Sequence, residues 1–207
     1  MVRLVPLGDK PGEQAHHNKE GEMNKTLKVI IFSVVETAGL AIWLALLLGT
    51  LDFFLASRLV AFVVLAGFLV FEHLFSYNTA HGKGLFNFSG VPILKLLGIS
   101  LSESIVWVVW LQIFVGAGVV VAAIFLSLIF IPQHKIELNV IEGRPVFQGL
   151  LAGRVVGFSI VEGVGSSVWG KLAMGTQGTL GVAVLLVTLL VEHFIQVKKT
   201  QIVVKTL

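Results

Sequence analysis

The feature that most constrains this chain is a series of long apolar segments, at about 27–49, 58–77, 96–115, 118–132, 155–173 and 180–197. A helix rises 1.5 Å per residue, so about 20 apolar residues cross the roughly 30 Å hydrocarbon core of a bilayer. Charged residues make up 13% of the 207 residues, about half of the roughly 25% found in soluble domains. The sequence therefore predicts an all-α integral membrane protein with six transmembrane helices, embedded in the lipid bilayer. The stretch 116–118 is the only turn expected between the third and fourth helices.

The basic residues lie mostly on one side of the predicted spans. Of fifteen Lys and Arg residues, only Arg58 and Lys171 fall in the turns on the opposite side. Because positively charged loops favour the cytoplasm, we expect both termini there and the protein in the cell membrane. Residues 1–26 are then a flexible N-terminal tail, 27–197 the transmembrane domain and 198–207 a C-terminal tail. The single, scattered basic charges argue against a nucleic-acid partner, and a homo-oligomer stays open.

An internal repeat links the predicted helices. Each odd-numbered segment contains S-x-x-E-x6-W without a gap, and each even-numbered segment carries a Glu-His or Gln-His pair near its cytoplasmic end. These motifs predict three tandem two-helix hairpins at about 27–77, 96–134 and 155–197, related by a pseudo-threefold axis along the membrane normal. Six extra residues fall in the first outer turn, around 51–57. The motif residues are Ser33, Glu36 and Trp43; Ser100, Glu103 and Trp110; Ser159, Glu162 and Trp169; and the pairs Glu72-His73, Gln133-His134 and Glu192-His193.

The repeat gathers polar groups at one depth of the membrane. On each odd helix the Ser lies one turn before the Glu, and the Trp two turns after it. Five Glu, one Gln and three His should therefore meet in the cytoplasmic half, with an apolar layer of three Trp beyond them. Carboxylates in a membrane must face one another, pair with His, bind a cation or hold protons, because isolated charges there are costly. Gln133 breaks the carboxylate symmetry, so the second repeat should behave differently.

The favoured functional hypothesis is proton or small-cation translocation, through an acidic, His-bearing cavity open to the cytoplasm. Intramembrane carboxylates mark ion paths, and His changes charge near neutral pH. The residues expected to bind or relay the ion are Glu36, Glu103, Glu162, Glu72, Glu192, His73, His134 and His193. The residues expected to line the cavity are Ser33, Ser100, Ser159, Trp43, Trp110, Trp169 and Gln133.

Two other hypotheses compete with translocation. The first is a membrane-embedded enzyme or redox subunit, binding a divalent metal through Glu36, Glu103, Glu162, His73 and His193, or haem through the even-helix His residues. Adjacent Glu and His point about 100° apart on a helix, which counts against one helix offering both to one metal. The second is a structural subunit, in which the Glu and His groups only fasten the bundle. The sequence does not decide whether the protein is an enzyme.

Overall fold

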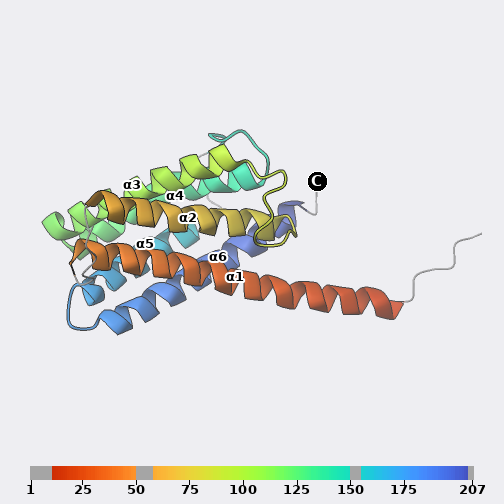
Figure 1. Cartoon of the computed structure of the whole chain (residues 1–207), viewed down its shortest axis with the longest axis horizontal. Coiled ribbons are helices and arrows are strands. Elements are labelled where there is room, and N and C mark those ends of the chain that lie inside the picture. Colours follow the sequence, from red (N-terminus) through yellow and green to blue (C-terminus); the bar gives the residue numbers. More distant parts are fainter. Residues whose placement is uncertain (1–10, 50–57, 150–154, 205–207) are drawn as a thin grey trace, which may run out of the picture.

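The computed structural model describes the backbone of residues 11–49, 58–149 and 155–204, and the side chains of 26–49, 58–149 and 155–198. These residues form six α-helices and, over the same ranges, no strand. The helices are α1 (Pro11–Leu47), α2 (Arg58–Ala80), α3 (Ile93–Ala117), α4 (Val119–Ile141), α5 (Val156–Ala173) and α6 (Gly178–Val204). Figure 1 shows them as an elongated bundle, with the start of α1 and the end of α6 at one end. We call this the termini end.

The turn expected at 116–118 is confirmed. α3 ends at Ala117 and α4 begins at Val119, with Gly118 between them at φ 90° and ψ 171°. A side chain is strained at such a positive φ, so glycine suits this position. The hairpin therefore reverses within one residue.

Three helices extend beyond their expected limits. α4 continues through Pro132 to Ile141, because neighbouring helices and side chains tolerate a proline inside a membrane helix. α1 already begins at Pro11 and α6 continues to Val204, so helical backbone enters both segments expected to be tails. Pro11 occupies the first helical position, where its missing N–H costs nothing. The expected turn at 51–57 and the ends of the chain at 1–10 and 205–207 lie outside the described residues.

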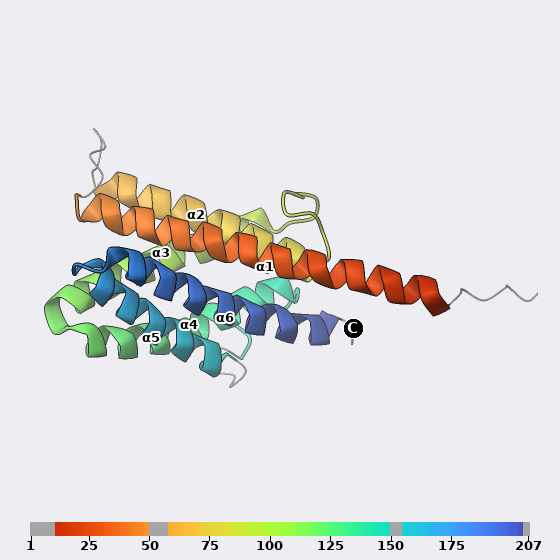
Figure 2. The same ribbon diagram turned by 90° about the horizontal axis from the view of Figure 1, so that it is seen from below.

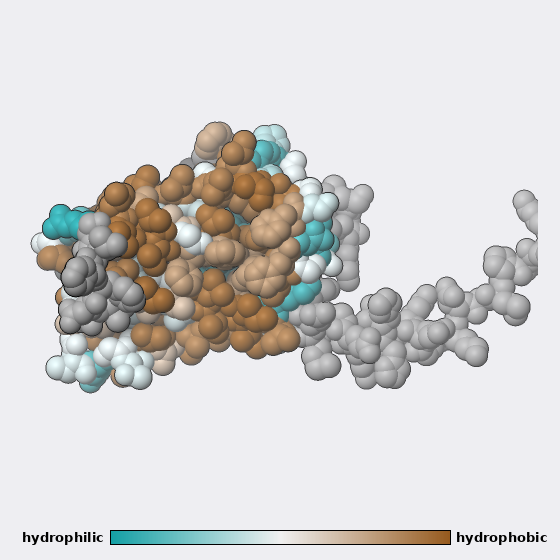
Figure 3. Space-filling model, viewed as in Figure 1, coloured by the Kyte–Doolittle hydropathy of each residue, from teal (hydrophilic) through white to brown (hydrophobic). Residues whose placement is uncertain are grey.

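Five of the helices are long and apolar enough to cross a membrane. They are α1 from Thr26 onward, α2, α3, α4 and α6 up to Lys198, with mean hydropathies between 1.6 and 2.2. A belt of apolar side chains covers the face shown in Figure 3, and large residues such as Leu59 and Leu94 are 70% and 85% exposed. Soluble monomers rarely expose apolar surface on this scale. The chain is therefore a helical, multi-pass membrane protein.

α5 differs from the other helices, because it has 18 residues and is rich in Gly and Ser. It packs against α4 and α6 at very short distance. A Cβ on Gly163 would lie 2.8 Å from the Cα of Ser127, and a Cβ on Gly165 would meet the side chain of Thr188. Small residues let helix backbones approach closely in membranes. α5 is thus a closely packed helix of the bundle, although its own hydropathy does not mark it as a span.

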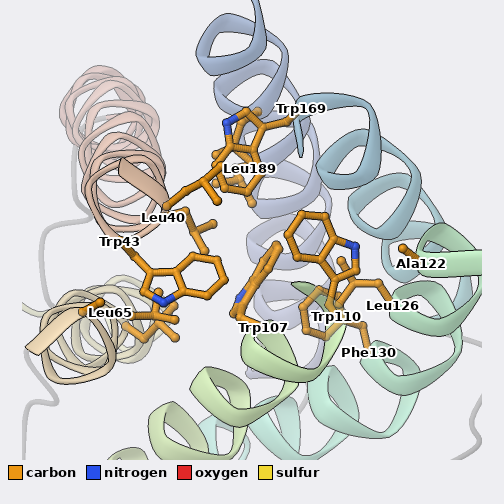
Figure 4. Close-up of a cluster of buried hydrophobic side chains, with 14 of the residues drawn as sticks. Leu40, Trp43, Leu65, Trp107, Trp110, Ala122, Leu126, Phe130, Trp169 and Leu189 are labelled. Carbon is orange, nitrogen blue, oxygen red and sulfur yellow. The ribbon is translucent and has the colours of Figure 1, made fainter. Parts of the chain in front are cut away.

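The helices form a closed ring. Each packs against the next in the sequence, and α6 packs against α1. Figure 2 shows α6 running beside α1. At the end away from the termini the ring is filled by four buried indoles, which Figure 4 shows among leucines from several helices. Trp107 joins the three expected tryptophans, with its ring centroid 5.4 Å from that of Trp110 and 6.3 Å from that of Trp169. We call Trp43, Trp107, Trp110 and Trp169 the tryptophan layer.

Candidate functional site

Nine ionisable side chains line one small space inside the ring, nearer the termini end than the tryptophan layer. They are Glu36, Glu72, His73, Glu103, His134, Glu137, Glu162, Glu192 and His193, and we call them the Glu–His cluster. All nine are at most 8% exposed. The space between them measures about 10 Å³, about the volume of one probe sphere, so the side chains nearly fill it and an ion would lie among the ligand atoms themselves. The structure thus brings together all eight residues expected to bind or relay an ion, in a compact cluster rather than a wide vestibule.

A larger hollow of about 510 Å³ lies on the outside of the bundle, between α4 and α5. Its lining is almost entirely aliphatic, with Val120, Ile124 and Val164 among the residues that face it. Its only polar side chains are Ser127 and Ser167, so it offers no ionisable group, unlike the space inside the Glu–His cluster.

Each imidazole of the cluster is held by a serine from the next helix in the ring. The Ser Oγ to His Nδ1 distances are 3.1 Å for Ser100 and His73, 2.9 Å for Ser159 and His134, and 2.7 Å for Ser33 and His193. The three serines of the repeated motif therefore do not line the central space. They lie behind the histidines and fix the orientation of the rings.

The opposite ring nitrogen of each histidine faces a carboxylate from the same neighbouring helix. The His Nε2 to Glu Oε2 distances are 3.2 Å for His73 and Glu103, 2.8 Å for His134 and Glu162, and 3.2 Å for His193 and Glu36. Each S-x-x-E motif thus contacts one imidazole through both its serine and its glutamate. This arrangement occurs three times around the ring.

The serines also fix which ring nitrogen carries a proton. Ser33, Ser100 and Ser159 each donate their hydroxyl hydrogen to the carbonyl four residues earlier, at 2.9 Å. A hydroxyl has one hydrogen, so it accepts in its second bond, and His Nδ1 must be the donor. In a neutral imidazole Nε2 is then a lone pair that faces a carboxylate oxygen. Two acceptors at about 3 Å require a proton or a metal cation between them.

Three sets of ligand atoms lie close enough to hold one ion each, within 4.8 Å of one another. The sets are Glu36, Glu72 and His193; His134, Glu162 and Glu192; and Glu36, Glu103 and Glu162. The carboxylates of the three odd helices therefore converge, as the repeat predicted. Carboxylate and imidazole together suit Zn²⁺, Mn²⁺ and Fe²⁺, and such sets form two-metal sites in helical bundles.

Several oxygens of the cluster make no hydrogen bond within the described part of the chain. They are Oε2 of Glu36, Oε2 of Glu162 and Oε1 of Glu192, on side chains that are 2–3% exposed. Two of them lie 3.2 and 2.8 Å from an imidazole nitrogen, a separation that a proton or a metal cation between the two atoms would bridge. Buried polar atoms are normally satisfied, so each exception needs an explanation. Ligand atoms that surround a common cation have this arrangement.

Adjacent Glu and His side chains approach each other in the structure, but none of the three sets of ligand atoms combines an adjacent pair. Glu192 Oε2 lies 3.0 Å from Nε2 of His193, and Glu72 Oε2 lies 3.2 Å from Nδ1 of His73. A glutamate side chain has three rotatable bonds, so it reaches around the helix despite the angle of about 100° between successive residues.

Gln133 does not line the central space. Its amide donates to the carbonyl of Ile99 at 3.2 Å, and its Oε1 accepts a hydrogen bond from Ser102 at 3.1 Å. A carboxylate that the sequence analysis missed, Glu137, enters the cluster from one turn further along α4. Ser76 donates to it at 3.1 Å. The spacing of four from Gln133 places Glu137 on the same helix face, but the predicted repeat ended at residue 134.

The tryptophan layer lies beyond the cluster rather than in its lining. Among the described hydrogen bonds, one joins the layer to the cluster: Nε1 of Trp107 donates to Glu103 at 3.3 Å. Trp110 donates instead to the hydroxyl of Ser167 at 3.2 Å, and its ring stacks on Trp169 with centroids 6.0 Å apart. The layer therefore closes the ring directly next to the charged groups.

Two buried asparagines close the loops at the termini end in the same way, and the sequence analysis missed both. Asn78 donates to the carbonyls of residues 85 and 87, and Asn139 donates to those of residues 146 and 148, at 2.8–2.9 Å. Gly82 and Gly143 follow at φ 66° and 67°. Each asparagine lies six residues after the Glu or Gln of a Glu-His or Gln-His pair. This recurring spacing is the signal that could have revealed the two asparagines.

The chain matches no known protein-family model, no curated protein and no solved structure.

Proposed function

We propose that this membrane protein binds divalent metal cations in the Glu–His cluster. The observation that carries the proposal is that three His Nε2 atoms, on rings oriented by serines, lie 2.8–3.2 Å from carboxylate oxygens. Histidines that bind metals usually donate their other ring N–H to a second group, which orients the ring. The three serines provide that group here.

Charge balance favours a metal over protons on the histidines alone. The cluster contains six glutamates and three histidines. Protonation of all three histidines would still leave three buried carboxylates without an opposite charge, and unpaired buried charges cost several kcal/mol each, roughly. Divalent cations neutralise two carboxylates apiece and use the oxygens that lack hydrogen bonds.

Haem does not fit the site. Sites for cofactors and small molecules occupy about 300 Å³ or more, whereas the space between the histidines and glutamates measures about 10 Å³. The Nε2 atoms of the histidines also face carboxylates rather than an open slot. The Glu–His cluster is therefore not a haem site.

We also propose the arrangement in which the cluster lies in the membrane. Six spans would form three parallel hairpins around a pseudo-threefold axis, in the cell membrane with both termini cytoplasmic. The threefold recurrence of the Ser–His–Glu contacts supports the repeat, as do the matching asparagine loops after α2 and α4. The distribution of basic residues supports the orientation.

Proton or cation translocation, the function that the sequence favours, is the second candidate. A run of buried polar groups supports it, because Ser76, Asn78, Thr79 and Asn139 continue from the cluster toward the termini end. The tryptophan layer counts against it, since the indoles are at most 1% exposed and fill the ring on the other side. Access from one side suits ion loading, whereas translocation would need this layer to open.

Metal analysis of the purified protein tests the proposal. The detergent-solubilised chain is stripped with a chelator, incubated with Mn²⁺, Fe²⁺ or Zn²⁺, desalted and measured by mass spectrometry. We expect stoichiometric metal in the wild type and a loss of at least one ion in Glu162→Gln. Metal at background with all three ions would refute the proposal. Ion flux into proteoliposomes that Glu162→Gln abolishes, without bound metal, would support translocation instead.

A further inference from the structure

We infer that the cluster holds two metal ions rather than three, in two half-sites of the same composition joined by Glu103. This inference rests on the proposed metal binding and specifies its number and class. The first half-site contains Glu36, Glu72 and His193, and the second contains Glu162, Glu192 and His134. Each combines one glutamate of an odd helix with one glutamate and one histidine of even helices.

The two half-sites have similar dimensions. In the first, Nε2 of His193 lies 3.2 Å from Glu36 and 3.6 Å from Glu72. In the second, Nε2 of His134 lies 2.8 Å from Glu162 and 3.9 Å from Glu192. The other oxygen of Glu192 lies 3.0 Å from Nε2 of His193, so this carboxylate also borders the first half-site. Donor atoms bound to one ion at about 2.1 Å lie roughly 3.0–3.5 Å apart. The observed distances bracket that range, so small side-chain rotations suffice to complete each site.

The third position of the ring lacks one ligand. His73 and Glu103 take the places of the histidine and the odd-helix glutamate, with Nε2 and Oε2 3.2 Å apart. The remaining place falls to Gln133, whose amide bonds Ile99 and Ser102 instead. Glu137 lies one turn further along α4 than Gln133 and adds a carboxylate to the cluster. That carboxylate accepts a hydrogen bond from Ser76. This position therefore has two ligands where the half-sites have three.

The aromatic side chains that pack on the histidines also distinguish the two half-sites from the third position. Phe32 packs on His193 with centroids 4.5 Å apart, and Phe158 packs on His134 at 4.8 Å. Both phenylalanines directly precede a motif serine, and Ile99 occupies the corresponding place before Ser100. The histidines of the two half-sites thus share an aromatic neighbour from the preceding position of the motif, and the third motif has no aromatic residue there.

Glu103 lies beside both half-sites, with Oε1 accepting a hydrogen bond from Trp107 and Oε2 3.2 Å from Nε2 of His73. Its carboxylate lies within 4.8 Å of ligand oxygens on Glu36 and Glu162, which belong to different half-sites. A carboxylate between two ions is the usual bridge in dinuclear centres of helical bundles. Each ion then has two terminal carboxylates, one imidazole and a shared oxygen. This set without thiolate suits Mn²⁺, Fe²⁺ or Zn²⁺.

Manganese loading and electron paramagnetic resonance test the inference on the full-length protein. We expect two Mn²⁺ per chain in the wild type, with the spectrum of an exchange-coupled pair. Glu72→Gln and Glu192→Gln should each retain one Mn²⁺ and give the six-line spectrum of an isolated ion. Gln133→Glu should raise the number from two to three, because a carboxylate cannot donate to the carbonyl of Ile99 and turns to the cluster. Gln112→Glu, exposed on α3, is the matched control and should leave it at two.

The outcomes separate the inference from the proposed function. One or three ions in the wild type, or two ions with an uncoupled spectrum, would overturn the dinuclear arrangement while metal binding stands. No bound ion would overturn both. If a glutamine variant fails to fold, as judged by size-exclusion chromatography, the wild-type ion count and spectrum still decide.

Discussion

The Glu–His cluster and the tryptophan layer are both buried inside the same bundle, yet their surroundings vary differently from one Glu-His or Gln-His pair to the next. In the hydrophobic core around the layer, the residues seven before the Glu or Gln of each pair are all leucine, while those three before it are Leu69, Phe130 and Leu189. All of these are fully buried, so a phenylalanine replaces a leucine without any compensating polar contact. In the cluster, the single change to Gln133 comes with two new hydrogen bonds and with Glu137 one turn away.

The difference follows from the forces that stabilise the two regions. Dispersion and close packing require only that volume be filled, and aliphatic and aromatic groups do this in several combinations. A buried polar atom requires a partner of suitable type and position, because burial without one costs roughly several kcal/mol of folding free energy. The layer therefore depends on total volume and the cluster on individual atoms. The substitutions below separate these two kinds of dependence.

The largest loss of stability is expected from Gly163→Val, because the added side chain would push α5 away from α4 and so disturb both the cluster and the layer. The added Cβ would lie 2.8 Å from the Cα of Ser127, so α5 could not keep its distance from α4. We expect a loss of more than about 4 kcal/mol, seen as aggregated or absent protein in size-exclusion chromatography. Gly157→Ala is the control on the same helix, since nothing lies within 4 Å of its Cβ. Normal folding of Gly163→Val would contradict the close packing of α5.

Trp169→Ala should damage the layer while leaving the cluster intact. The indole is fully buried and stacks on Trp110, so its removal should cost about 3–5 kcal/mol of unfolding free energy. Denaturation in mixed detergent micelles measures this cost. Metal content of the folded fraction should equal that of the wild type, since no atom of the indole contacts a cluster side chain in the described interactions. Loss of metal from protein of normal stability would show that the two regions are not separate.

The smallest effect on stability, and a specific effect on binding, is expected from Ser159→Ala. This change removes the group that orients His134, and loss of such a partner lowers metal affinity about 10–100-fold. Chelator competition with Mn²⁺ measures the affinity. Ser102→Ala is the control, because Ser102 contacts Gln133 and the carbonyl of Ile99 rather than a histidine. Equal affinities for both variants would contradict a role of the motif serines in binding.

Much of the architecture could be predicted, because hydropathy and glycine act locally. The helix positions agree within a few residues at most boundaries, and the turn at Gly118 is where the sequence placed it. The end of α4 and the helical parts of the expected tails were missed. Pro132 and the charged termini indicate helix ends in isolation, whereas tertiary contacts and helix propensity continue the backbone through them.

The sequence by itself determined which polar residues recur at the same spacing in the three S-x-x-E motifs, since this spacing fixes their relative position and face on each helix. Only the tertiary structure decided what those residues contact. The packing of the helices sets Ser159 behind His134, and hydrogen bonds to Ile99 and Ser102 hold the Gln133 amide away from the central space. The same packing buries Glu137 in the cluster and Trp107 in the layer, although neither belongs to the motif. Contacts between helices distant in the sequence depend on how all six pack together, and no local pattern contains that information.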